Sequence, residues 1–222
     1  MFRKAITDIA IEGNEISVSR RLDISVAEAE EQIANLAYSG VGLTKDKKVE
    51  KAKLPPFALA FYYHLFSRRC IPTEEELYHR YLSFSGKPMN EEELLIDDEA
   101  YSVEGVKARL LRTYPSLIRD FHLYLLLCES GKFENVTYSL SQDYYRGLDL
   151  CVYLSGKAFH LSLFIKTKRA SLFKKRKVFR HDYKNVTEIE LALDFHSLVK
   201  HGEIALCTKS HVEAVFQKAK GT

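Results

Sequence analysis

The chain has 222 residues, 46% of them hydrophobic and 28% charged, with a formal net charge of +3. A chain of this size can bury one good core, or one core and a small accessory domain, so we expect it to fold unaided. No stretch approaches the roughly 20 uninterrupted apolar residues of a membrane span, and no apolar signal segment follows Met1 to Lys4. These features predict a cytoplasmic protein with no membrane partner.

The first ~85 residues read as helical. A short helix is expected from Ile16 and a turn over 23–25, followed by a second helix that Ser25 caps and that ends before Ser39-Gly40. This arrangement weakly resembles a winged helix-turn-helix. Its second helix is acidic, which favours helical packing over DNA reading, although both readings stay open.

Basic residues fill the segment 45–53, which is predicted to be a solvated linker before an apolar helix over 57–66. Another helix should begin after Thr73, a natural N-cap. The acidic segment 91–99 is expected to be an exposed connector. We therefore place a helical, winged-helix-like domain at residues 1–100 and an α/β domain at residues 101–222.

The second half is predicted to begin with a helix from Val103 that Pro115 interrupts and restarts. The restarted helix is apolar around almost its whole circumference, so its later turns should be buried on more than one side. The short connections between the first three strands imply antiparallel neighbours. The elements expected after the helix are strands at 133–140, 148–154 and 159–167, a basic helix at 170–179, a strand at 186–193, a helical turn at 195–200, a strand at 203–208 and a helix from 210.

The order αβββαβ resembles the core of the PD-(D/E)XK, or restriction-endonuclease-like, nuclease superfamily over about 103–208. The resemblance implies an α/β (α+β) fold with a mixed sheet. It also implies an acid on the first helix, which Asp120 matches, and a Gly-x-Asp strand, which Gly147 to Asp149 match. The family's acid-x-Lys motif falls on the third strand, where Lys168 matches the lysine.

From this resemblance, Asp120, Asp149 and Lys168 are the candidate catalytic residues, and Asp120 and Asp149 the candidate Mg²⁺ ligands. The chain departs from the family at Lys166, which stands where the family carries an acid. At ~4 Å and an effective dielectric near 20, this cation and a divalent ion would repel by roughly 8 kcal/mol. Either Lys166 turns outward and another acid, Asp143 or Glu104, replaces it, or the site binds no metal.

Both aspartates also have ordinary structural readings. Asp149 lies in an otherwise apolar run, where it could mark an exposed strand entrance or pair with Arg146 or Lys168. Asp120 could be a surface acid beside Arg119.

Cationic residues crowd the segment 166–184, where the only acid is Asp182. Such density can neutralise several phosphates and release their counterions, which predicts salt-dependent and largely sequence-blind nucleic-acid binding. A solvated face or an acidic protein partner remains the alternative. The candidate nucleic-acid-binding residues are Lys166, Arg169, Lys174, Lys175, Arg176, Lys177 and Arg180.

Two main functions follow. The first is a Mg²⁺-dependent DNA endonuclease of a restriction, phage-defence or transposition system. The second is a catalytically inactive nucleic-acid-binding or protein-adaptor subunit of a larger complex, with no cofactor. The four cysteines are expected to be free thiols, because they lack paired CxxC or Cys/His spacing for zinc.

Overall fold

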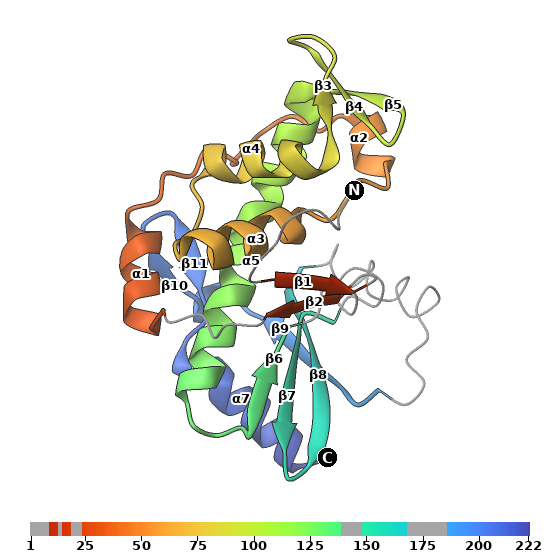
Figure 1. Cartoon of the computed structure of the whole chain (residues 1–222). Helices are drawn as coiled ribbons and strands as arrows, with labels where there is room; N and C mark the ends of the chain where they lie inside the picture. The colour runs from red at the N-terminus through yellow and green to blue at the C-terminus, as the bar shows by residue number, and fades with distance from the viewer. Residues whose placement is uncertain (1–8, 13–14, 19–23, 139–147, 168–185) are drawn as a thin grey trace.

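A computed structural model describes residues 9–12, 15–18, 24–138, 148–167 and 186–222. Helices and small sheets are mixed along the chain, as expected for an α+β fold. The long helix α5 (Val103–Glu129) runs through the molecule, with the other helices and the largest sheet arranged around it (Figure 1). No described helix has the length and apolar character needed to cross a bilayer.

The N-terminal segment contains an antiparallel hairpin of β1 (Ile9–Glu12) and β2 (Glu15–Val18). The short helix expected from Ile16 is therefore wrong, because β-branched residues at alternate positions favour an extended chain here. The second helix is confirmed as α1 (Val26–Ala34), where the Ser25 side chain and Glu28 form a reciprocal capping box. It ends several residues earlier than expected.

Two of the next three helices match their predictions. Helix α3 (Phe57–Arg68) is the expected apolar helix, and α4 (Glu74–Ser85) begins after Thr73, whose side chain accepts from the Glu76 N–H. The basic linker is wrong in part, since it contains α2 (Lys47–Lys51), capped by Asp46. One buried residue, Val49, packs this short helix into the core.

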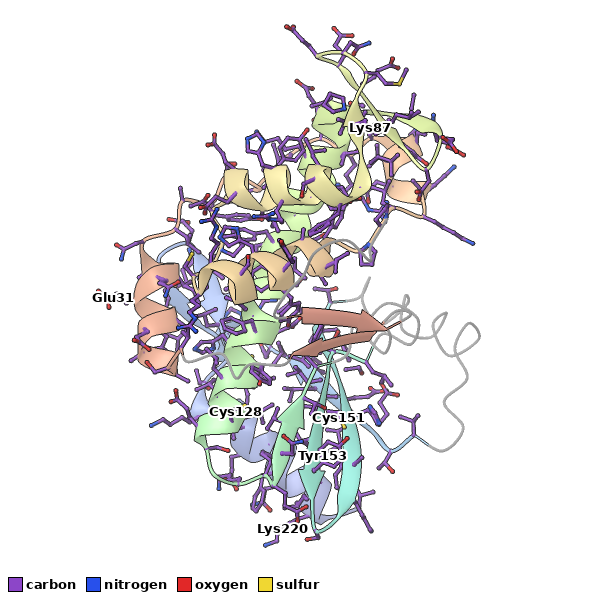
Figure 2. The ribbon with its side chains drawn as sticks, viewed as in Figure 1. Glu31, Lys87, Cys128, Cys151, Tyr153 and Lys220 are labelled. Atoms are coloured by element: carbon purple, nitrogen blue, oxygen red, sulfur yellow. The ribbon has the colours of Figure 1, made fainter. Side chains whose placement is uncertain are left out.

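The acidic segment before residue 100 forms a three-stranded antiparallel sheet of β3 (Lys87–Pro88), β4 (Glu93–Ile96) and β5 (Glu99–Ser102). The expected connector is wrong because two apolar side chains, Leu94 and Ile96, are buried between the acids. Lys87 on this sheet lies at the opposite end of the molecule from Lys220 (Figure 2).

Helix α5 is continuous, so the expected interruption at Pro115 is wrong. Proline cannot donate to the Leu111 carbonyl, yet burial on several sides of the helix stabilises the uninterrupted form. Gly40 packs against that carbonyl, since a Cβ built at Gly40 would lie 2.8 Å from the Leu111 oxygen. The close approach therefore depends on the absence of a side chain at position 40.

The largest sheet has the order β6-β7-β8-β9, formed by β6 (Asn135–Thr137), β7 (Leu150–Leu154), β8 (Lys157–Ile165) and β9 (Glu188–Leu193). The first three strands pair antiparallel, as their short connections predicted, and β9 pairs parallel to β8. A parallel pair requires a crossover connection between its two strands. The basic helix expected at 170–179 lies outside the described residues.

The chain ends with the 3₁₀ turn η2 (Phe195–Ser197), the hairpin β10 (Val199–His201) and β11 (Ile204–Leu206), and helix α7 (Lys209–Lys220). Strand β11 and the final helix were predicted, whereas β10 replaces part of the expected helical turn. All four cysteines are free, as expected.

Two hydrophobic clusters meet on α5. The first contains residues of the four helices α1, α2, α3 and α4 and of strands β4, β5 and β11, packed against α5 residues such as Tyr114 and Ile118. The second places Leu123 and Leu127 of α5 against the β6–β9 sheet and α7. The boundary expected near residue 100 falls in β5, which packs in the first cluster beside α5.

We predict that Gly40→Ala lowers the free energy of unfolding by about 1–3 kcal/mol, because the added methyl would meet the Leu111 oxygen and the Tyr38 ring. Urea unfolding measures this change. The control is Gly221→Ala, where the nearest atom to an added Cβ is 3.5 Å away and the effect should stay within about 0.5 kcal/mol. Equal stability of Gly40→Ala and the wild type would contradict the close approach.

A buried histidine links α1 to α5. His122 is fully buried, its Nε2 lies 3.0 Å from Glu30 Oε1, and its Nδ1 has no hydrogen-bond partner among the described residues. Burial lowers the pKa of His122 most strongly, and His201 lowers it further, whereas Glu30 and Glu129 raise it. The neutral ring donating from Nε2 therefore fits this environment, with Nδ1 left as a bare acceptor.

We predict that His122 makes the protein less stable in acid. Its folded pKa is lowered, so the unfolded chain takes up the proton first and stability falls below about pH 6.5, by up to ~1.4 kcal/mol per pH unit. His122→Leu should reduce the loss of unfolding free energy between about pH 7.5 and pH 5.5, which urea titrations at each pH measure. An unchanged loss would assign the acid sensitivity to other groups, such as His64 and His211, whose pKa values burial also lowers.

Candidate active site

One pocket brings together the N-terminal half, α5 and the open end of the β6–β9 sheet, with a volume of about 400 Å³. Its walls include the start of α3, one face of α5, and the ends of β8 and β9. Among the described residues, Asp120 and Asp149 are its two acids. The remaining lining residues are Leu54, Pro55, Pro56, Phe57, Ala58, Arg109, Thr113, Ser116, Leu117, Arg119, Leu163, Phe164, Ile165 and Leu193.

Asp149 is fixed at the entrance to β7. Its backbone N–H donates to the Leu161 carbonyl at 2.7 Å, and its Oδ2 accepts from the Leu163 N–H. The carboxylate therefore bonds to the backbone of β8, while the residue lines the pocket and remains partly exposed. Asp149 therefore lies just before the first residue of β7, as one of the structural readings expected, and its side chain also has a specific partner.

Asp120 comes from the middle of α5. The pocket-lining residues Arg109, Thr113, Ser116, Leu117 and Asp120 recur at helical spacing, so one face of α5 forms the wall. Burial of the opposite side of the helix sets this orientation. Asp120 and Asp149, which lie far apart in the sequence, thus line one pocket.

Lys166 does not line this pocket. It is exposed just beyond β8, where its backbone N–H donates to the Leu193 carbonyl at 2.8 Å. Glu104 is a wrong candidate for the missing acid, because it lies at the beginning of α5 and lines a different pocket. Asp143 lies outside the described residues.

Three further sequence predictions concern residues that the structure does not describe. The candidate catalytic residue Lys168 follows shortly after β8, and Arg146, a proposed partner of Asp149, precedes β7. The rest of the basic segment, Arg169, Lys174, Lys175, Arg176, Lys177 and Arg180, also lies outside the described ranges. Its role in nucleic-acid binding stays a prediction.

The donor set of the pocket fits a hard cation. Two carboxylates supply oxygen ligands, and Mg²⁺ is commonly held by one or two carboxylates, with water and substrate phosphate completing the shell. Within the described ranges, no group of three or more His, Cys, Asp or Glu side chains is placed to hold a metal. Any cation here would take its remaining ligands from water, from substrate or from residues outside the described ranges.

Two arginines in the pocket were not predicted. Arg109 Nη1 donates to the carbonyls of Val49 and Ala52 at the end of α2, and Arg119 Nε donates to the Ala205 carbonyl at 3.0 Å. Arg119 is buried, with 9% of its surface exposed. Its position inside an otherwise apolar helical stretch was the available signal, since a buried cation requires partners.

We predict that Asp149→Ala lowers the free energy of unfolding by about 1–3 kcal/mol, because the Leu163 N–H would lose its acceptor. Asp149→Asn keeps a carbonyl oxygen at the same position, so most of the stability should remain. Urea denaturation of the two variants separates the hydrogen bond from the charge. Equal losses in both variants would show that the acceptor contributes little.

Comparison of the chain with protein-family models, with curated proteins and with solved structures finds no match.

Proposed function

We propose that the protein is a metal-dependent phosphodiesterase acting on DNA, with an αβββαβ core of the PD-(D/E)XK kind. The observation that carries the proposal is the shared pocket of Asp120 and Asp149 at the end of β8. The sheet order supports it, since two antiparallel connections and one crossover give three antiparallel strands followed by a parallel fourth strand, as the αβββαβ order requires.

In this proposal the chain's own residues position the reacting groups. Asp149 is held against β8 by the Leu163 N–H, and Asp120 is held by the packing of α5, so neither carboxylate depends on a mobile loop. A bound Mg²⁺ would polarise the phosphate and lower the pKa of its bound water. Lys168, two residues beyond Lys166 on the chain, would orient the attacking water as the family resemblance implies.

The outward position of Lys166 removes one objection to this function. A lysine among the metal ligands would strongly oppose a divalent cation, but Lys166 is exposed and does not line the pocket. The acid that the family carries at this position then comes from Asp143, which lies outside the described residues, or the site has one ligand fewer.

A second candidate is a non-catalytic nucleic-acid-binding subunit of a larger complex, of restriction, phage-defence or transposition type. The acid missing at position 166 favours it. In this case the basic segment would bind phosphates and the pocket would not cleave them. Binding should then weaken steeply with salt, by a slope of about 0.9 per phosphate neutralised.

We predict cleavage of plasmid or single-stranded DNA that requires Mg²⁺ or Mn²⁺ and falls about 100-fold or more in Asp120→Asn, Asp149→Asn and Lys168→Ala. Gel assays with purified protein measure the rates. Glu203→Gln is the matched control, because Glu203 is an exposed acid outside the pocket. Salt-sensitive binding without cleavage would replace the proposal by the second candidate, and product that persists in the variants would remove this site.

A further inference from the structure

Helix α3 begins at the pocket. Pro56 is its N-cap residue and makes no side-chain capping hydrogen bond, and the first turn contains no acid. Pro56, Phe57 and Ala58 all line the pocket. The first N–H groups of a helix have no intrahelical acceptor, and the helix dipole adds partial positive charge there, so this end of α3 attracts an anion.

Arg119 provides a second, independent feature of the same pocket. The residue is about nine-tenths buried, and its Nε donates to Ala205 at 3.0 Å. Within the part of the chain that the structure describes, its Nη1 and Nη2 have no hydrogen bond, and no carboxylate lies within ion-pairing distance. Neither nitrogen is among the fully buried atoms that lack a partner, so both keep some exposed surface, and Arg119 lines the pocket.

A guanidinium that is mostly buried and still has unused donors can bind an anion through charge-assisted hydrogen bonds, which are stronger away from bulk water. Phosphate suits this position, because its oxygens can accept two parallel hydrogen bonds from arginine and others from backbone N–H groups. Arg109 is less suited to bind the phosphate, since its Nη1 already donates to two carbonyls.

The two aspartates on the same pocket limit which anion can bind. A free anion would be repelled by Asp120 and Asp149, whereas a phosphate can share a divalent cation with them. The volume of about 400 Å³ lies within the ~300–1,000 Å³ of small-ligand sites, which suits one nucleotide of a strand.

We propose that the first turn of α3 and the Arg119 guanidinium form a phosphate-binding cradle facing Asp120 and Asp149. The cradle binds a phosphate of the substrate strand and positions it beside the two carboxylates. That this phosphate belongs to a nucleic acid rests on the proposed function, whereas phosphate binding itself does not.

The sharpest test is Pro56→Asp. An aspartate at this N-cap would accept from the free N–H groups of α3 and place a negative charge where the phosphate should bind. We expect this variant to keep or gain thermal stability, while its affinity for inorganic phosphate in the presence of Mg²⁺ falls at least about 10-fold. Calorimetric titration measures the affinity, and NMR should show the Phe57 and Ala58 amide signals shifting with phosphate only in the wild type.

Two further variants complete the design. Thr208→Asp puts the same charge at the N-cap of α7, outside the pocket, and should leave phosphate affinity unchanged. Arg119→Lys keeps the charge but loses the planar pair of donors, so a folded variant should also bind phosphate more weakly. The cradle is overturned if the wild type shows no saturable phosphate binding, or if folded Pro56→Asp binds as the wild type does.

The outcomes separate the cradle from the proposed function. Phosphate binding that is lost in Pro56→Asp, in a protein that cleaves no DNA, would support the cradle and reject the nuclease. DNA cleavage whose KM and kcat are unchanged in Pro56→Asp would support the nuclease and reject the cradle.

Discussion

Burial of α5 on several sides is the constraint on which the rest of the structure depends. Tyr114 and Ile118 of α5 belong to the first hydrophobic cluster, and Leu123 and Leu127 belong to the second. A helix packed in this way cannot rotate without opening both clusters, because interiors are close-packed. The same packing explains why Pro115 is accommodated inside the helix, and it fixes the one face of α5 that lines the pocket.

The pocket therefore takes its geometry from the scaffold. Asp120 is carried by α5, which is buried on several sides, and Asp149 is bonded to the backbone of β8. Positioning groups on rigid elements lowers the cost of arranging them when a substrate binds. In the function that we propose, the two acids would hold a cation and Arg119 an anion beside it in the same pocket, as phosphoryl chemistry requires.

The helical N-terminal half contributes directly to this pocket. The beginning of α3 forms one wall, and Arg109 holds the end of α2 close to it. In the function that we propose, the N-terminal half would form part of the active site itself. The exposed Glu31 lies on the outer side of α1 (Figure 2), and no residue of α1 is among the described residues that line the pocket.

The sequence by itself determined the elements whose signals are local. Ser25 and Thr73 marked helix starts through their capping chemistry, and the short connections around β7 predicted antiparallel pairing. It also singled out Asp149 as a charge in an apolar run, and Asp120 through the family resemblance. Other signals were misread, because the burial of Leu94 and Ile96 in the acidic segment and the continuity of α5 through Pro115 depend on packing partners distant in sequence. The folded structure was needed to show that both aspartates share a pocket with Arg119 and the start of α3, and that Lys166 lies outside it. These residues are far apart in the sequence, and their side chains meet only after the sheet and α5 have packed together.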